Sequence, residues 1–569
     1  MKTLTVITAF CLLTLSALTG QTRTVGLFLN DTSKVFKGYT LFAPKQNTMT
    51  YLINNEGRIV HQWTASKFPP GQSVYLLENG NLLRTCMTKG NLSSGGGEGG
   101  RIEEYNWNDS LVWSMDFSTT TYMQHHDIHI LPNGNIIMLV IEKKTYAEAI
   151  AAGFNPAKFQ PEIAQKGMML PDYIAEVKRT YPTGGTVVWE WHTWDHLIQD
   201  FDATKLNYGV VKDHPELVDA AGDQKNLPAF WNHMNSIDYH PAFDQIALSV
   251  RGNSEVWIID HSTTTAEAKS HSGGKRGKGG DLLYRWGNPV AYRSGTVANQ
   301  RYFQQHDVEW VNPGSPGAGN LTCFNNGLGR GNYSTADEFT PAVDSAGNYS
   351  MTAGSAASPA NLSWTFKYTP VGDTMYSENI SGAYRLANGN TIICSGTVGQ
   401  FYEVTSAGQL VWRYVCPVDQ FGRITQGFKP HPDTVRAGEL MNSVFRVYKY
   451  PLNYSAFTGR DLTPGSYVEL YSSGVEQANQ ILQSFTLDQN YPNPFNPSTT
   501  IQYTLAGNSM VRLAVYDLLG REAAVLVNSR ESAGTHSVEW NAEQFPSGVY
   551  FYRLSAGGLS VTKKLILEK

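Results

Sequence analysis

The stretch WNHMNSIDYHPAFDQIALSVRGNSEVWIID, residues 231–260, decides the fold. IALSV and SEVWIID are runs of β-branched and aliphatic residues around a short polar turn, which predicts two adjacent strands. His233, Asn235 and Ser236 stand at the front of the stretch, and Arg251 stands between the two runs. An imidazole, a carboxamide and a guanidinium at neighbouring strand ends suit the binding of a tetrahedral oxyanion. An ordinary β-hairpin with polar ends is the alternative.

Strand–turn–strand units of this kind recur along the chain. The clearest carry Asn-Gly-Asn in the turn: SVYLLENGNLLRT (73–85), DIHILPNGNIIML (127–139) and AYRLANGNTIICS (383–395). Residues 236–249 and 307–324 are looser copies. Asn-Gly between apolar runs is the strongest short hairpin signal, because both central residues need a positive φ. The chain is therefore expected to be a repeat protein built from hairpins.

A second strand pair, often ending in Trp, follows these hairpins. The copies are residues 50–63, 101–113, 174–191, 256–286, 366–378 and 401–414. Since there are six second halves and five first halves, we expect the strand-like segment 441–451 to supply the missing half. A C-terminal strand that pairs with N-terminal strands closes a β-propeller and hides its edges. The sequence predicts an all-β fold, a six-bladed β-propeller over residues 22–473; a β-sandwich is the alternative.

The first residues and the composition bear on the compartment. A short basic start, Met1-Lys2, precedes the apolar run Val6–Leu18, and small residues follow. This order predicts a secretory signal peptide over residues 1–20, with a buried N-terminal strand as the alternative. No later segment has about eighteen consecutive apolar residues, so we expect no transmembrane span. The net charge of −5 gives no electrostatic argument for binding nucleic acid or an anionic membrane.

The cysteines give no pattern for a metal site. Cys11 leaves with the signal peptide, and Cys86, Cys323, Cys394 and Cys416 lie far apart with no CxxC spacing. An even number in an exported protein permits disulfides, whose pairing the sequence does not give. Buried free thiols are equally compatible with the sequence.

Two insertions interrupt the repeat. Residues 144–170 look partly helical, and residues 192–230 are polar with several aromatics. Both leave the same side of the predicted ring, so we expect them to form a lid or an acceptor pocket. The run SSGGGEGG (93–100) lacks the strand–loop–helix context of a phosphate-binding loop and is expected to be flexible. The segment TYPTGGTVVW (180–189) lacks a phosphate-binding lysine and is expected to be a turn.

Alignment of the first halves places a histidine at the start of three inner strands. His126 and His306 each precede an aspartate, and His233 lies two residues before Asn235. The starts of the innermost strands share one mouth of a propeller channel, so the three histidines should meet at one point. Arg251 ends the strand that leaves the blade of His233 and should reach the same region.

Three histidines could also bind a metal ion, and each alone could be a structural residue. Arg251 decides between a metal and an anion, because a fixed cation repels a divalent metal but complements sulfate or phosphate. We therefore predict no metal and no cofactor. His125 and His129 lie beside His126, so the choice of the third channel histidine stays open, although in a strand His129 would point to the opposite face from His126.

Several stretches carry a resemblance to a known family. WNHMNSIDYH…TTTAEA (231–268), GGKRGKGGDLLYRWGNP (273–289) and QRYFQQHDVEWVNPGSPGAGN (300–320) closely resemble the bacterial arylsulfate sulfotransferase family, and residues 125–135 and 388–412 fit it too. The resemblance covers roughly residues 25–470. It implies a six-bladed propeller that moves a sulfuryl group from a phenyl sulfate donor to a phenol acceptor without the nucleotide donor PAPS.

The resemblance also implies roles for five residues. His306 matches the histidine that takes the sulfuryl group as a covalent sulfohistidine. His233, Asn235 and Arg251 match the set that grips the sulfate, and His126 matches the remaining channel histidine, which handles the phenol proton. A neutral imidazole is a competent nucleophile near pH 7. Transfer of this kind depends mostly on positioning and charge complementarity.

The character of the chain changes after about residue 473. A polar linker, residues 474–484, precedes short strands with Asp and Gly turns, which predict a small immunoglobulin-like β-sandwich. YPNPFNPSTTI and the ending GVYFYRL…KKLILEK closely resemble the C-terminal sorting domain of the type IX secretion system, over residues 485–569. That resemblance implies passage across the outer membrane of a Bacteroidetes-type envelope, followed by release or surface anchoring.

We therefore predict an exported arylsulfate sulfotransferase that works by a ping-pong mechanism through a sulfohistidine. Its partners would be a small-molecule phenolic sulfate donor, a phenol acceptor and the type IX secretion machinery, with no nucleic acid; a homodimer is left open. One alternative is a non-catalytic surface propeller that binds ligands in the same channel. The other is an aryl sulfate hydrolase, with water as the acceptor.

Overall fold

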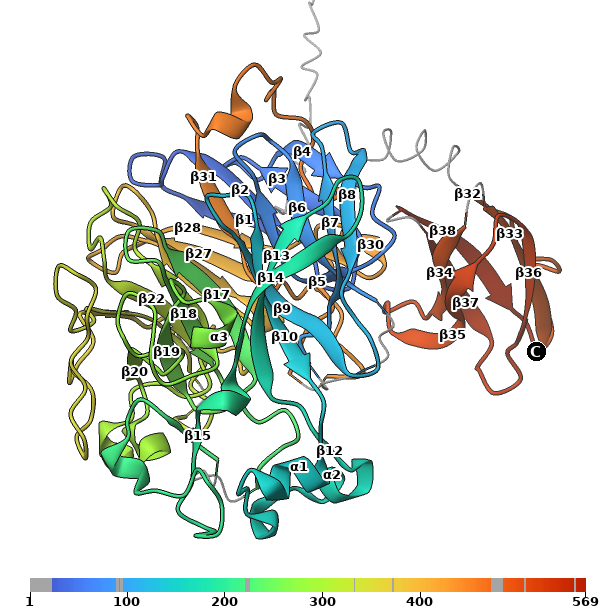
Figure 1. Cartoon of the computed structure of the whole chain (residues 1–569). Coiled ribbons are helices and arrows are strands. Elements are labelled where there is room, and N and C mark those ends of the chain that lie inside the picture. Colours follow the sequence, from blue (N-terminus) through green and yellow to red (C-terminus); the bar gives the residue numbers. More distant parts are fainter. Residues whose placement is uncertain are drawn as a thin grey trace, which may run out of the picture.

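The computed structural model describes residues 23–88, 92, 96–220, 226–331, 333–370, 373–436, 438–471, 485–505, 508–556 and 559–569. The described part consists mainly of strands and turns, which confirms the all-β prediction (Figure 1). The predicted signal peptide and the predicted linker lie outside these ranges. No helix within them is long and apolar enough to cross a membrane.

Six antiparallel sheets of four or five strands follow one another through the described residues between 26 and 451. Their orders are β31-β2-β3-β4, β5-β6-β7-β8, β9-β10-β13-β14, β17-β18-β19-β20, β21-β22-β23-β24 and β25-β26-β27-β28-β1. The strand bounds are β1 Gly26–Asn30, β2 Gly38–Phe42, β3 Thr50–Ile53, β4 Ile59–Trp63, β5 Pro70–Leu76, β6 Leu82–Met87, β7 Gly100–Tyr105, β8 Leu111–Asp116, β9 Tyr122–Ile130, β10 Ile136–Glu142, β13 Asp172–Arg179, β14 Gly185–His192, β17 Met234–His240, β18 Gln245–Val250, β19 Glu255–Asp260, β20 Tyr284–Trp286, β21 His306–Trp310, β22 Leu321–Asn325, β23 Thr335–Phe339, β24 Trp364–Phe366, β25 Gly382–Arg385, β26 Thr391–Ser395, β27 Gln400–Val404, β28 Leu410–Val415 and β31 Tyr448–Pro451.

The three Asn-Gly-Asn turns form the hairpins that the sequence predicts, β5–β6, β9–β10 and β25–β26. Gly80, Gly134 and Gly389 take φ values of +85°, +83° and +87° in these turns. Such a backbone conformation costs a glycine little and most other residues more. These positions therefore fix where each chain reversal occurs and hold the register of the inner strands.

The first sheet takes its first strand from the far end of the chain. β31 pairs antiparallel with β2, with Tyr39 opposite Tyr450, which confirms the predicted pairing between segment 441–451 and an N-terminal strand. The ring of Tyr448 on β31 lies 5.4 Å from that of Tyr384 on β25 and 5.0 Å from that of Tyr75 on β5. The strand is therefore in contact with the sheets on both sides of it.

The first strands of successive sheets lie against one another. β5 contacts β9, β9 contacts β17, β17 contacts β21, and β21 contacts β25. Apolar side chains of adjacent sheets fill the space between them; one such cluster joins Ile137 and Ile174 to Ile246 and Trp257. Each sheet therefore buries both of its faces, which explains the near-continuous apolar runs in β10 and β18.

One predicted strand pair is wrong. We expected a hairpin over residues 366–378, but β24 ends at Phe366, and the described residues after it up to 378 form no strand. The partner of β24 is β23, Thr335–Phe339, which the repeat pattern did not reveal. A loop rich in Ala and Ser, residues 340–363, separates these two strands, so they do not form a contiguous sequence unit.

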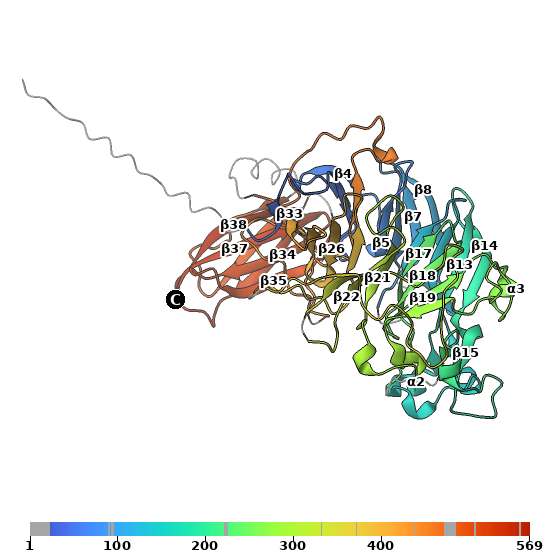
Figure 2. The same cartoon turned by 90° about the vertical axis from the view of Figure 1, so that its left-hand side faces the viewer.

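The two insertions lie together at one end of the sheets, near the labels α1, α2 and β15 (Figures 1 and 2). Residues 144–170 are partly helical, as predicted, with α1 Tyr146–Ala151 and α2 Pro161–Lys166. Residues 192–230 contain the parallel pair β15 Leu197–Ile198 and β16 Val218–Asp219. The ring of Phe154 stacks on Trp194 at 5.4 Å, so the insertions pack on each other.

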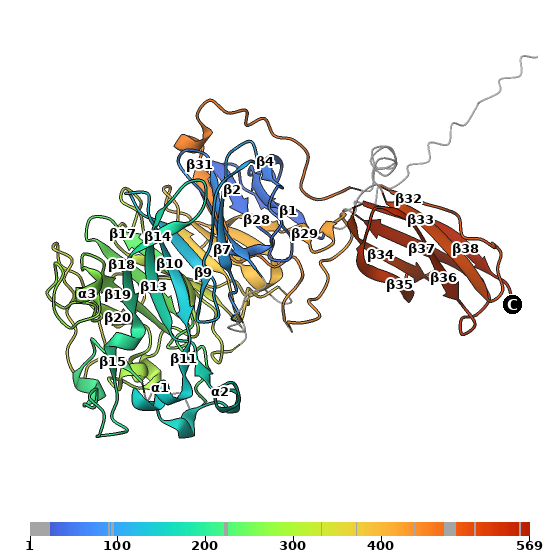
Figure 3. The ribbon, with the colours of Figure 1, turned by 45° about the vertical axis from the view of Figure 1, so that its right-hand side comes forward.

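The C-terminal residues form two further antiparallel sheets, seen as a separate group of strands in Figure 3. The sheets are β32-β33-β36 and β35-β34-β37-β38. A common core that includes Ile501, Leu513, Trp540, Tyr552 and Leu565 joins them. The immunoglobulin-like topology stays a prediction. The bounds are β32 Phe485–Leu487, β33 Ser498–Leu505, β34 Ser509–Tyr516, β35 Glu522–Glu531, β36 Gly534–Asn541, β37 Gly548–Ala556 and β38 Leu559–Leu567.

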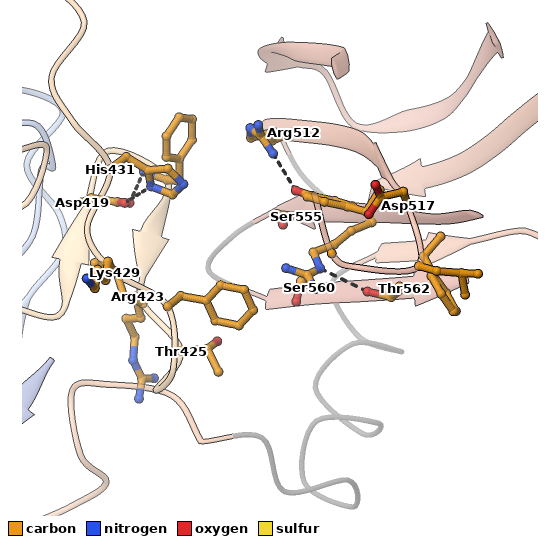
Figure 4. Close-up of a pocket in the computed structure, with 18 residues that line it drawn as sticks. Asp419, Arg423, Thr425, Lys429, His431, Arg512, Asp517, Ser555, Ser560 and Thr562 are labelled. Carbon is orange, nitrogen blue, oxygen red and sulfur yellow. Dashed lines mark hydrogen bonds and ion pairs between the residues drawn. The ribbon is translucent and has the colours of Figure 1, made fainter. Parts of the chain in front are cut away.

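A cavity of about 680 Å³ lies between the C-terminal sheets and residues 419–431 (Figure 4). Its lining includes Asp419 and His431 on one side and Arg512 and Thr562 on the other. None of the residues predicted to carry chemistry lines this cavity.

Candidate active site

The candidate site begins at irregular starts of three inner strands. His126 and His233 have φ values of +46° and +49°, and Asp307, next to His306, has +64°. The register of β9, β17 and β21 shifts at these positions, as in a β-bulge. A positive φ in a bulky residue is costly, and bulges re-aim side chains near functional sites. The backbone therefore holds the histidines in directions that a regular strand would not give.

The structure brings His126, His233 and His306 together. The ring centroids of His126 and His233 are 5.1 Å apart. The ring of Phe445 lies 6.0 Å from His126 and 6.5 Å from His306, so it neighbours both. Phe230 stacks on His233 at 4.4 Å. The cluster therefore has two aromatic walls.

The two neighbouring histidines have different surroundings. His129 directs its Nδ1 to Asp238 at 3.2 Å, on β17 of the next large sheet, and stays partly exposed. His125 is fully buried, and its Nδ1 lies 2.8 Å from Nδ1 of His126. Thus His129 belongs to a separate contact with Asp238, whereas His125 lies directly behind His126.

Arg251 is a cation whose side chain is not directly paired with any described residue. It is partly buried, and its side chain forms no hydrogen bond or ion pair with the residues that the structure describes; its Nε is fully enclosed. Glu378 acts on it through charge. A guanidinium presents several donors in a fixed fork that fits an oxyanion. An unpaired guanidinium in this position is available to bind an anion.

All three imidazoles are disposed to be neutral. Burial lowers the pKa of His126, His233 and His306 well below the usual 6.5. The charge of Arg251 lowers it further at His233 and His306. His233, His125 and His306 add to the effect at His126. Near neutral pH each ring therefore keeps a lone pair, as a nucleophile or a general base requires.

The carboxamide of Asn326 fixes the orientation of His306. Its Nδ2 donates to the carbonyls of Ser377 and Ile380, at 2.7 and 2.9 Å, so its Oδ1 faces His306 Nδ1 at 2.8 Å. His306 must then carry its proton on Nδ1 and its lone pair on Nε2. That lone pair accepts the backbone N–H of Ile380 at 3.1 Å.

Asn235 contributes less directly than the sequence suggests. Its Nδ2 donates to the carbonyl of Gln305 at 2.8 Å, and its buried Oδ1 has no partner among the described residues. The free atom is therefore an acceptor, which does not complement a sulfate oxygen. Both side-chain polar atoms of the buried Asn232 lack partners in the same ranges, so the residue before His233 offers a donor that we did not predict.

The glycine-rich run that we expected to be flexible lies against the site where the structure describes it. The backbone N–H of His126 donates to Gly97 at 2.8 Å, and Glu98 pairs with His125 in an isolated β-bridge. A Cβ added to Gly97, whose φ is +69°, would come within 1.7 Å of His126. Residue 97 must therefore be glycine for the backbone to cover the ring so closely.

A second arginine lies behind the cluster and is fully paired. Arg446 bonds to Asp127 at 2.8 Å and Asp307 at 3.0 Å, and it donates to the carbonyl of Asn235 at 3.2 Å. These groups come from three different sheets. Because its charge is matched by two buried carboxylates, Arg446 braces the inner strands, and Arg251 is the cation left for a ligand.

Other chemistry-bearing groups lie elsewhere. Cys86, Cys323, Cys394 and Cys416 are buried free thiols. Ligand-capable atoms of His196, His271 and Asp281 lie within 4.8 Å of one another, on segments that do not contribute to the histidine cluster.

Two known sequence families match the chain. The arylsulfotransferase (ASST) family matches residues 26–415, and a secretion system C-terminal sorting domain matches residues 489–568. The chain belongs to the arylsulfotransferase family. The first match covers the strands that carry all the predicted site residues, and the second covers most of the C-terminal sheets. The sorting domain marks this arylsulfotransferase for type IX secretion to the cell surface or beyond.

No curated protein matches the sequence. Similar solved structures include a Bacteroides caccae protein of unknown function, with 11% identity, 73% of this chain and 98% of that chain covered, and a TM-score of 0.35. Streptogramin B lyase has 10% identity, coverage of 76% and 94%, and a TM-score of 0.32. Hydrazine synthase of Kuenenia stuttgartiensis has 14% identity, coverage of 53% and 67%, and a TM-score of 0.30. At these TM-scores the likenesses carry no argument about this chain.

Proposed function

We propose that the protein transfers a sulfuryl group from an aryl sulfate to a phenol by a ping-pong mechanism, with His306 as the covalent carrier. The observation that carries the proposal is Arg251, a cation with no partner in the described residues, whose charge acts on two of three neutral imidazoles in one cluster. A cation beside a neutral nucleophile complements a sulfate ester. Membership of the arylsulfotransferase family supports the same chemistry.

In the first half-reaction, the lone pair on His306 Nε2 attacks the sulfur of the donor. An N–S bond forms, the S–O bond to the aryl group breaks, and the aryl oxygen keeps the electron pair. Arg251 stabilises charge on the sulfuryl oxygens. Since Nε2 accepts the N–H of Ile380, attack requires a small turn of the ring or of that backbone, where Ile380 and Ser381 have φ values of +48° and +93°.

In the second half-reaction, the oxygen of the acceptor phenol attacks the sulfur and the N–S bond breaks. The electron pair of that bond returns to His306 Nε2, and a base takes the phenolic proton. His126 is a neutral imidazole of the cluster that does not itself stack on Phe230, and we assign this role to it. The rings of Phe230 and Phe445 provide apolar walls for the aryl groups of donor and acceptor.

We also propose that the six large sheets are the blades of one propeller over residues 22–473. The successive contacts between first strands support this assignment, as does the strand β31, which touches the sheets on both sides. A signal peptide over residues 1–20, a linker over 474–484 and a sorting domain over 485–569 complete the proposed organisation. The mature chain would pass the inner membrane first and use the sorting domain afterwards.

The test is intact mass of the mature chain after brief mixing with 4-nitrophenyl sulfate and no acceptor. We expect a stoichiometric gain of one sulfuryl group, mapped to His306 and discharged by added phenol. His306→Ala should abolish the gain, whereas His214→Ala, an exposed histidine away from the cluster, should not.

Other outcomes would overturn the proposal. Steady release of nitrophenol without an adduct would indicate a hydrolase that uses water as the acceptor. Saturable binding of aryl sulfates without adduct or release would indicate a binding module.

A further inference from the structure

Three buried side chains lie in a row that leads to the histidine cluster: Asp172, His125 and His126. We propose that Asp172 and His125 are positioning residues that fix the tautomer of His126, so that its Nε2 carries the phenolic proton between the two half-reactions. This inference rests on the proposed function and adds two residues that the family resemblance did not supply.

At the Asp172 end, this row of side chains is held by a backbone N–H of the next sheet. One oxygen of Asp172 accepts the backbone N–H of Met234 at 3.1 Å, beside His233. The other oxygen lies 2.8 Å from Nε2 of His125, in a bent contact. Asp172 and His125 are both fully buried. Burial raises the pKa of Asp172 above its usual value, and the contacts with His125 and with the N–H of Met234 offset only part of this rise. The tautomers of His125 and His126 described next are those that hold while Asp172 is ionised.

The three contacts determine where the protons lie. An ionised carboxylate only accepts, so Nε2 of His125 carries a hydrogen and faces Asp172. In a neutral ring the lone pair is then on Nδ1, which lies 2.8 Å from Nδ1 of His126. One proton must lie between these two nitrogens, so His126 donates it. The lone pair of a neutral His126 is therefore on Nε2, the atom that forms no hydrogen bond with the described residues.

The surrounding groups keep water away from the contacts between Asp172, His125 and His126. The ring of Phe230 meets His125 edge-on at 5.2 Å, and the backbone of Gly97 and Glu98 covers the other side. A carboxylate used only to hold the N–H of Met234 would not need a buried histidine in contact with both it and His126. The arrangement resembles a base held in one tautomer by a buried acid, as in hydrolytic triads.

The proton balance follows from this tautomer. When the acceptor oxygen attacks the sulfohistidine, His126 Nε2 takes the phenolic proton and the ring becomes a cation stabilised through His125 by Asp172. His126 returns to its neutral resting state by giving this proton to the aryl oxygen of the next donor or to solvent. Each turnover thus removes one proton from the acceptor and returns one to the leaving group.

The decisive variant is Asp172→Asn in the full mature chain. The amide can keep the bond to Met234 through its oxygen and donate from its nitrogen to His125 Nε2. This reverses both tautomers and places the hydrogen of His126 on Nε2, where it cannot accept a proton. We expect adduct formation from 4-nitrophenyl sulfate to stay within about 3-fold of wild type, because nitrophenolate leaves without a proton. Discharge to phenol should fall by about 10²–10⁴-fold.

Asp260→Asn is the matched control. Asp260 is also buried, and its carboxylate accepts from Ser262 and the N–H of Arg276, far along β19 from the cluster. We expect both half-reactions to keep their wild-type rates in this variant. A second pair distinguishes packing from proton placement: His125→Asn keeps an acceptor near the position of Nδ1, and His125→Leu does not. Discharge should be at least tenfold faster in the first.

Three results would overturn the inference. The first is discharge unchanged in Asp172→Asn, the second is an equal slowing of both half-reactions in that variant, and the third is discharge at the same rate in the two His125 variants. Any of these would make the row purely structural. If the wild-type protein forms no adduct, the proposed function itself is wrong and the inference falls with it; the two failures are therefore distinguishable.

Discussion

Asn326 determines which nitrogen of His306 is free to react. Its Oδ1 lies 2.8 Å from His306 Nδ1, and its own amide hydrogens are both used by backbone carbonyls, so it cannot present its nitrogen instead. A flexible side chain would allow either tautomer, but this carboxamide is held at three points. The nucleophile of the proposed reaction is thus selected by a residue twenty positions further along the chain.

Asn326→Ala should therefore slow the first half-reaction. With no acceptor at Nδ1, the ring can hold its proton on either nitrogen and can turn, and we expect adduct formation to fall by on the order of 10²-fold or more. The measurement is the rate of the mass gain with 4-nitrophenyl sulfate. Asn325→Ala, which removes a buried amide bound to Arg301 and Asp337, is the control. An adduct formed at the wild-type rate in Asn326→Ala would contradict this role.

Substitution of Arg251 should weaken the use of the donor. Charge-assisted hydrogen bonds are worth about 1.5–3 kcal/mol, so Arg251→Ala should lower kcat/KM for the donor by about 10–100-fold. Arg251→Lys keeps the charge but not the fork, and it should recover part of the loss. Steady-state kinetics at several donor concentrations will measure both. Equal kcat/KM in wild type, Arg251→Ala and Arg251→Lys would show that Arg251 does not bind the donor.

The pH dependence of adduct formation should lack a transition at the usual histidine value. The pKa of His306 is lowered by burial and by Arg251, so the nucleophile is neutral at pH 7 and is protonated only at a pH well below 6.5. As the pH falls from 7 to about 6, the rate should therefore stay flat. Single-turnover rates in a buffer series will test this. A loss of half the rate near pH 6.5 would show that the imidazole is not desolvated as described.

Gly97→Ala should lower transfer activity by more than the free-energy cost of its positive φ explains. The new methyl group would meet the ring of His126, whereas Gly184, with a similar φ of +81°, has nothing within 4 Å of its added Cβ. We expect both variants to lose about 1 kcal/mol of stability for the positive φ, and only Gly97→Ala to lose transfer activity by a factor of ten or more. Thermal denaturation and transfer assays on the two proteins give the comparison.

Removal of Arg446 should destabilise the fold. Arg446→Met would leave Asp127 and Asp307 as neighbouring buried carboxylates, and loss of one partner from a buried ion pair costs about 3–5 kcal/mol. The comparison is Arg521→Ala, whose exposed pair with Asp517 should be worth less than about 1 kcal/mol. Urea denaturation of both variants will show the difference, and similar midpoints would mean that Arg446 does not brace the strands.

Much of the fold followed from turn chemistry. The Asn-Gly-Asn turns indicated where strands end. The one second strand pair without a first half predicted the pairing of β31 with β2. The strand β23 was missed because a long loop separates it from its partner, so no local pattern joins them. Helical and extended segments in the insertions could be expected from composition, but their packing on Trp231 depends on distant residues.

The site was only partly readable. The histidine column was visible because histidines recur at equivalent strand starts, and Arg251 because it ends a strand in the blade of His233. Asn326 and Asp172 were not visible, because each contacts a histidine on another strand of the same sheet that is distant in the chain. Gly97 was not visible because its loop reaches a neighbouring sheet. From the sequence alone, a glycine run predicts a flexible loop, because the ring that it covers is seen only in the structure. The His-His dipeptide did direct attention to His125, but only as an alternative to His126 and not as its partner.

The pairing of β31 with β2 also has a consequence for the life of the chain. The edge of β2 is completed by a strand that is synthesised some 400 residues later. Any product that ends before residue 448, from premature termination or proteolysis, carries an open strand edge that invites pairing with other chains. We therefore expect the enzyme to exist either whole or as aggregate and degraded fragments, with no partly active shortened form in between.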